Sequence, residues 1–230
     1  MLYLKLRELG IGNWGLATAA ILILLACADA SAQSSPAGAA AGPSQPASPA
    51  APWSFQLAGA SYLLPHDDDY VQPTVTADRG ALHLESRYNY EDRHSLSAFL
   101  GWNTAVGRRV QLELTPMIGV VGGDTEGVIP ALALSLAFRR VELYSENELV
   151  VDVNETDDSY FYSWSEFSVW PVEWLRAGVV GQRTKALQQS RDLQRGILAG
   201  VAFGAIETTA YFFNPGADDH YVVFSVGLSF

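Results

Sequence analysis

Apolar residues alternate with small or polar residues along most of the chain, and this period of two constrains the fold more than any other feature of the sequence. The last segment shows it best: every second residue from Val222 to Phe230 is apolar, whereas the residues between them, from Tyr221 to Ser229, are mostly small or polar. Successive side chains of a β-strand point to opposite faces of the sheet, so this pattern predicts strands that each have one apolar face.

Twelve segments that fit the same alternation follow one another after residue 52. They span 53–64, 69–78, 81–91, 95–104, 108–121, 127–138, 140–152, 159–169, 173–184, 194–203, 206–214 and 220–230. Tight connections, such as Arg79-Gly80 and Gly204-Ala205, alternate with mostly longer acidic ones, such as 154–158 and 216–219. Short turns at one rim and longer loops at the other are typical of transmembrane β-barrels.

A sheet that spans a membrane has to close, because an open edge in hydrocarbon leaves backbone donors and acceptors unpaired at several kcal/mol each. We therefore predict an all-β fold, a closed antiparallel transmembrane β-barrel of about twelve strands, with ten strands as the fallback and a soluble β-sandwich as the alternative. Pro73, Pro116 and Pro130 each remove a ladder donor within a predicted strand, so we expect irregular pairing at these positions.

The closing segment 221–230 resembles the last strand of bacterial outer-membrane β-barrel proteins, in particular small porin-like barrels that end in phenylalanine. Those strands have apolar residues at alternate positions, and the barrel-assembly machinery of Gram-negative bacteria recognises their end. The residues that match and form the predicted assembly signal are Tyr221, Phe224, Val226, Leu228 and Phe230. The resemblance implies an integral outer-membrane barrel, either a narrow passive pore for small solutes or a structural barrel, with outer-membrane lipids, lipopolysaccharide and the assembly machinery as partners.

The first 52 residues have the features of export and linker segments. Lys5 and Arg7 precede an uncharged run, 11–28, that small residues follow, and 31–52 is rich in Ala, Pro and Ser. We predict a signal peptide over 1–32, a periplasmic linker over 33–52 and the barrel over 53–230. Cys27, the single cysteine, also lies in a stretch that resembles a lipoprotein cleavage box, so a periplasmic lipoprotein acylated at Cys27 is an alternative.

The charged residues bear on the partners of the chain and on the lining of a candidate pore. The formal net charge of −11 argues against a nucleic-acid partner. If the apolar faces point to lipid, the charged side chains of the strands face the lumen, and the predicted pore-lining residues are Glu85, Arg87, Glu113, Glu146, Glu148, Glu166, Arg176 and Glu207. Such side chains either cross the lumen and constrict it, or line a narrow pore in which surplus carboxylates favour cations.

The acidic loops carry the second candidate site. Closure of the barrel brings the first and last loops together, and divalent cations are the only cofactor that we expect there, on oxygen ligands from Asp67, Asp68, Asp69, Asp218 and Asp219. Histidines in the same loops, His66 and His220, make a rim-located outer-membrane hydrolase the alternative function. His94 is an unpromising base for Ser95 or Ser97, since these residues face opposite sides of a strand, and we assign no catalytic residue.

Aromatic residues near the predicted strand ends are expected to form girdles at the two membrane interfaces. These residues are Tyr88, Tyr90, Trp102, Phe138, Trp170, Trp174, Phe213 and Phe230.

Overall fold

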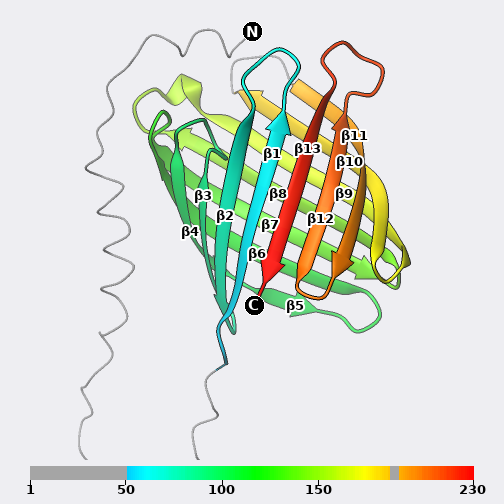
Figure 1. The fold of residues 1–230 in the computed structure, drawn as a ribbon. Helices are drawn as coiled ribbons and strands as arrows, with labels where there is room; N and C mark the ends of the chain where they lie inside the picture. Colours follow the sequence, from blue (N-terminus) through cyan, green and yellow to red (C-terminus); the bar gives the residue numbers. More distant parts are fainter. Residues whose placement is uncertain (1–50, 187–191) are drawn as a thin grey trace, which may run out of the picture. The chain divides into compact units, whose positions relative to one another are not determined.

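The computed structural model describes residues 51–186 and 192–230 (Figure 1), so the predicted signal peptide, Cys27 and most of the predicted linker lie outside the described residues. The strands are β1 (Ser54–Leu63), β2 (Tyr70–Arg79), β3 (Leu82–Tyr88), β4 (Leu96–Trp102), β5 (Thr104–Val106), β6 (Gln111–Gly122), β7 (Gly127–Phe138), β8 (Val141–Asp152), β9 (Tyr160–Val172), β10 (Leu175–Ala186), β11 (Asp192–Phe203), β12 (Ile206–Phe213) and β13 (Tyr221–Ser229). A short 3-10 helix, η3 (Thr156–Asp158), lies between β8 and β9. None of the described segments is a helix long and apolar enough to cross a membrane.

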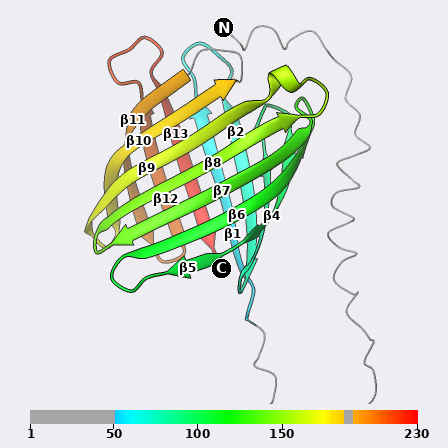
Figure 2. The same ribbon diagram turned by 180° about the vertical axis from the view of Figure 1, so that it is seen from behind.

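The strands form one closed antiparallel barrel (Figures 1 and 2). Apart from β4 and β5, which both pair with β6, strands that are consecutive in the sequence pair with each other, and β1 pairs with β13. The short strand β5 follows Asn103, just after the end of β4, and continues the pairing along the same partner strand, β6. The ring therefore has twelve members with β5 as an extra piece, which confirms the predicted fold class.

The two rims differ in the length of their connections. Two-residue turns at Gly80, Arg139 and Gly204 join strands at one rim, and each of these residues has a φ near +60°. This left-handed conformation suits glycine, and a positive φ at the first turn residue matches the twist of a hairpin. We call this rim the turn end and the opposite rim, which carries the longer connections, the loop end. The connection between the segments predicted at 95–104 and 108–121 lies later in the sequence than expected, because pairing continues to Val106.

The three prolines inside strands lie where one ladder stops or is interrupted, as predicted. Pro73 lies just beyond Thr74, the last β2 residue paired with β3. Pro116 pairs with β7 but lies opposite the break between β4 and β5, and Pro130 lies in a gap of the β7–β8 ladder. A proline has no N–H to donate, so each ladder loses a bond at these points. A bulge that the sequence did not predict lies at Trp170–Pro171, opposite Arg176.

The outward face of the barrel is apolar. On β13, Phe224 and Val226 point outward and are 50% and 51% exposed, whereas Val223 points into the barrel and is 1% exposed. Exposed large apolar side chains recur on the outward face of most other strands. A surface of this kind is stable in lipid and costly in water, which supports a membrane-spanning barrel.

The predicted aromatic girdles are correct in part. Tyr88, Trp102, Phe138, Trp174 and Phe230 are exposed near strand ends. The prediction is wrong for three other residues: Phe213 is buried inside the barrel, Tyr90 folds inward against Arg87, and the Trp170 indole donates to lumen-facing Glu142 at 3.2 Å. Proximity to a strand end did not reveal which face of the sheet each ring occupies.

The seam between β1 and β13 ends in a pair of phenylalanines. The Phe55 amide donates to the Phe230 carbonyl at 2.7 Å and the Phe230 amide donates back at 2.9 Å, while the two rings stack with centroids 5.8 Å apart. Trp53 stacks on Phe55 in turn, at 6.1 Å. The last residue of the predicted assembly signal thus also helps to close the barrel.

Phe230→Ala separates these two roles. In refolding from urea into detergent, we expect it to lower the free energy of unfolding by about 0.5–1.5 kcal/mol, the contribution of one aromatic pair. Phe203→Ala is the matched control, since Phe203 stacks on Trp174 at 5.9 Å away from the seam. In cells, only Phe230→Ala should lower the yield of heat-modifiable barrel on unboiled gels. Equal yields of the two variants would contradict the assembly signal.

Candidate functional site: the barrel lumen

The barrel lumen contains a polar cavity of about 700 Å³, and most of its lining residues lie in the half nearer the turn end. Its neutral polar lining includes Gln56, Gln72, Thr74, Thr76, Asn103 and Thr115. Its charged lining consists of Asp78, His83, Glu85, Arg87, Glu113 and Glu146. These side chains come from β2, β3, β6 and β8 among others, because alternate residues of every strand point inward.

Arg87 lines this cavity and crosses the lumen. It projects from β3 and is 2% exposed, yet its guanidinium reaches two carboxylates of β8, Glu146 at 2.5 Å and Glu148 at 3.0 Å. Three strands, β4, β6 and β7, lie between β3 and β8 around the ring. The Nε of Arg87 also bonds Glu85, and Nη1 lies 3.8 Å from Glu91. We call these five residues the Arg87 cluster.

Two aromatic rings contact the Arg87 guanidinium, that of Tyr90 from the loop after β3 and that of Phe99 from β4. Its central carbon lies 4.3 Å from the ring centroid of Tyr90 and 4.4 Å from that of Phe99, which are cation–π distances. Phe99 in turn lies directly over Gly119 of β6, where a Cβ atom would stand 2.4 Å from the ring. Glycine at this position therefore allows Phe99, and with it Arg87, to occupy the lumen.

The Arg87 cluster has more carboxylates than cations. One guanidinium faces the carboxylates of Glu85, Glu91, Glu146 and Glu148. Glu91 lies in the loop after β3, and burial raises the pKa of its carboxyl, with repulsion from Glu146 acting in the same direction. A buried cluster with surplus negative charge is sensitive to loss of its only arginine.

A second ion cluster lies on the opposite wall. Arg176 of β10 pairs with Glu166 of β9, and its Nη1 bonds Glu207 of β12 at 3.0 Å. The Glu166 carboxylate also accepts bonds from the Trp164 indole and the Tyr211 hydroxyl, both at 2.8 Å. Glu166 is thus satisfied by one cation and two neutral donors, as a buried carboxylate requires.

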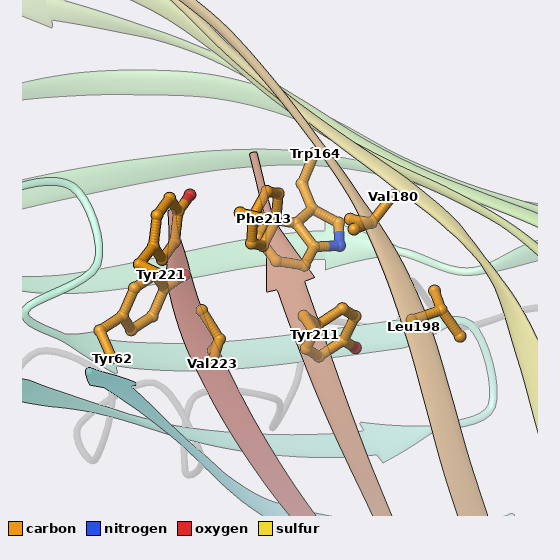
Figure 3. Close-up of a cluster of buried hydrophobic side chains, with 8 residues drawn as sticks. All are labelled: Tyr62, Trp164, Val180, Leu198, Tyr211, Phe213, Tyr221 and Val223. Carbon is orange, nitrogen blue, oxygen red and sulfur yellow. The ribbon is translucent and has the colours of Figure 1, made fainter. Parts of the chain in front are cut away.

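Apolar and aromatic side chains fill much of the remaining lumen toward the loop end. Figure 3 shows one cluster, made of Tyr62, Trp164, Val180, Leu198, Tyr211, Phe213, Tyr221 and Val223. Its rings stack closely, with 4.8 Å between the centroids of Phe213 and Tyr221. A second cluster contains Phe99, Met117, Val121, Ile129 and Val150. The side chains at this end therefore pack against one another, and Tyr62, Trp164, Tyr211 and Val223 also border the cavity.

His83 links the cavity wall to the Arg87 cluster. Its Nδ1 lies 2.8 Å from Asp78 and its Nε2 3.0 Å from Glu85, so the imidazole lies between two carboxylates. The Asn103 amide donates to the same Asp78 oxygen at 2.6 Å. The Thr115 hydroxyl donates to Asn103 at 2.7 Å. Asn103, at the break between β4 and β5, thereby extends the hydrogen-bond network to β6.

Comparison with known proteins gives a likeness in structure and none in sequence. No family model matches the chain, and no curated protein matches it. The structure superposes on the KdgM porin with a TM-score of 0.57 at 9% identity, covering 76% of this chain and 99% of that one. The chain has the fold of a porin. A protein from a study of in-meso crystallization of membrane proteins superposes with a TM-score of 0.51 at 10% identity, covering 76% of this chain and 83% of that one.

All eight predicted pore-lining residues lie on the lumen side of the barrel, but they do not line one open channel. Glu85, Arg87, Glu113 and Glu146 border the cavity. Glu148, Glu166, Arg176 and Glu207 belong instead to the two ion clusters. Tyr90 and Phe99, which complete the surroundings of Arg87, were not predicted as site residues. The alternation could have indicated Phe99, because it lies two residues after lumen-facing Ser97 and therefore on the same face of β4.

The structure does not assemble the predicted cation site in the loops at the loop end. Among the described residues, no group of three or more His, Cys, Asp or Glu side chains is arranged to hold a metal. Asp69 accepts from the Leu64 amide at 2.9 Å, Asp67 lies 3.5 Å from Arg93, and Asp219 accepts from Asn214 at 3.1 Å. The cation hypothesis stays a prediction, without a preformed site.

The residues considered for a rim hydrolase make other contacts. His94 lies 3.2 Å from Asp124, and both side chains are exposed. The Ser95 hydroxyl is buried and accepts from the Thr125 amide at 3.1 Å. His220 bonds the carbonyl of Ala217 at 2.9 Å. These contacts give the hydrolase alternative no support.

Proposed function

We propose that this chain is a narrow passive channel of the bacterial outer membrane for small cations, and that the Arg87 cluster limits its conduction. The observation that carries the proposal is Arg87 itself, which lines the polar cavity and spans the lumen of the closed barrel between β3 and β8. The KdgM porin supports a passive channel by its fold.

The preference for cations rests on the charges of the lumen. The cavity lining contains four carboxylates, from Asp78, Glu85, Glu113 and Glu146, against Arg87 and His83. Rings of acidic side chains favour cations in pores, since they lower the energy of a cation in a narrow section. Solutes have to be small, because a twelve-strand barrel is far narrower than a sixteen-strand porin with an open channel.

The orientation follows from the rims. We place the turn end, with the start of β1 and the end of β13, in the periplasm and the acidic loops outside, as in barrels with short periplasmic turns and longer outer loops. Most of the cavity lining then lies in the periplasmic half of the barrel.

The test is the reversal potential of the purified barrel in a planar bilayer under a potassium chloride gradient. We expect small discrete current steps and a reversal potential of the sign that potassium permeation gives. Glu113→Gln removes a cavity carboxylate that accepts a hydrogen bond from Gln111 at 3.2 Å, and should reduce the selectivity while leaving the steps in place. Chloride selectivity would contradict the cation proposal. A correctly folded barrel that never conducts would contradict the channel and favour a structural barrel.

A further inference from the structure

Two arginines point out of the barrel into the lipid-facing surface. Arg183 of β10 follows lumen-facing Gln182, and Arg195 of β11 precedes Gly196, which faces inward. The register pairs Arg183 with Leu193 and Gly181 with Arg195, so the two arginines are diagonal neighbours on the outward face. Side chains in this relation lie within reach of a common ligand.

No described carboxylate pairs with either arginine. The ion pairs of the described residues involve neither Arg183 nor Arg195, and the nearest aromatic contact is Phe161, whose ring centroid lies 5.8 Å from the Arg183 guanidinium. Both arginines lie three residues from the loop-end limit of their strands, Ala186 and Asp192. At this depth a long side chain extends to the head-group region, where a lipid-facing arginine costs little.

An apolar hollow adjoins Arg195 on the same outward face. It measures about 410 Å³, and its outward-facing lining consists of Leu143, Ser165, Phe167, Val179, Gly181 and Arg195. Gly181 leaves it unfilled, because a Cβ there would meet only one atom within 4 Å, the Gln194 carbonyl oxygen at 3.9 Å. The Ser165 hydroxyl is satisfied by Ser145 at 2.9 Å, so the hollow has little unmet polarity.

A cationic pair beside an apolar hollow is complementary to a lipid with a phosphorylated head group. We propose that Arg183, Arg195 and this hollow bind lipopolysaccharide, with a phosphate on the two guanidinium groups and an acyl chain in the hollow. Arginine suits this role because its planar guanidinium binds phosphate through two parallel hydrogen bonds. The inference rests on the proposed outer-membrane orientation and not on conduction, so a barrel without current leaves it intact.

The experiment measures lipopolysaccharide bound to the detergent-purified full chain by native mass spectrometry, followed by titration. The double variant Arg183→Gln/Arg195→Gln should bind at least about tenfold more weakly than wild type, since it loses both charge-assisted contacts. Arg79→Gln is the matched control: Arg79 points outward at the turn end, 5.6 Å from the Trp53 ring centroid, and its loss should leave binding unchanged. Equal binding by the double variant and wild type would overturn the arginine site.

Gly181→Leu tests the hollow separately. Leucine at this lipid-facing position fills the hollow while both arginines stay, so the barrel should remain heat-modifiable and bind lipopolysaccharide more weakly than wild type. Unchanged binding by Gly181→Leu would overturn the role of the hollow. Phosphatidylglycerol, a phospholipid with one phosphate, serves as the competitor. Displacement of lipopolysaccharide by an equimolar amount would overturn the assignment of lipopolysaccharide as the occupant.

Discussion

Arg87→Ala is expected to lower the free energy of unfolding by about 3–5 kcal/mol, the range for removal of one partner from a buried ion pair. The variant leaves Glu85, Glu146 and Glu148 close together in the lumen without their shared guanidinium. It also removes the cation that lies between the rings of Tyr90 and Phe99. Urea unfolding in detergent micelles, followed by the fluorescence of buried Trp164, measures the change.

Two further variants distinguish loss of charge from loss of packing. Arg87→Lys keeps the charge but lacks the planar donors that reach Glu146 and Glu148 together, and it should recover only part of the lost stability. Arg87→Ala/Glu146→Ala removes a cation and a carboxylate together and should be more stable than Arg87→Ala. If Arg87→Ala unfolds at the same urea concentration as wild type, the cluster is not a stabilising element.

The same double variant, Arg87→Ala/Glu146→Ala, is expected to raise the single-channel conductance by about threefold or more, because conduction through a pore depends on its narrowest section. It opens the section between β3 and β8 while the formal net charge of the lumen stays constant. A change in conductance then reports the width of the passage and not a change in ion concentration. Current steps in planar bilayers, measured at one salt concentration, give the comparison.

Arg176→Ala/Glu207→Ala is the matched control for conductance. It also removes one cation and one carboxylate from a lumen ion pair, but this pair lies on the β10–β12 wall and does not cross the lumen. Its conductance should stay close to wild type. If the control conducts as much as the Arg87 double variant, the passage is not limited by the Arg87 cluster, and the cluster of Tyr62, Trp164 and Phe213 becomes the next section to widen.

The sequence was sufficient for the barrel because its period of two is a local property. Alternation placed Phe224 and Val226 on the outward face and Glu85, Arg87 and Glu146 on the inward face, and the structure agrees at each position. The three strand prolines were also informative, since a missing N–H affects the ladder wherever the residue lies.

The contacts across the lumen could not be predicted in the same way. Arg87 bonds Glu148 over a separation of 61 residues, and no local pattern specifies which strands face each other inside a barrel. The sequence-based interpretation also assigned apolar residues to the lipid face. Ile129 and Val150 contradict this, because both point inward and pack together at the loop end. A filled lumen requires inward apolar residues that alternation alone does not distinguish from outward ones.

The contact between Gly119 and Phe99 has a consequence for the evolution of this barrel. A side chain at position 119 and the Phe99 ring exclude each other, and the ring supports Arg87. Mutational drift therefore cannot change these three positions independently. A lineage that acquires alanine at 119 has to replace Phe99 with a smaller side chain first or at the same time. In that lineage, an arginine at 87 has lost one of its two aromatic neighbours.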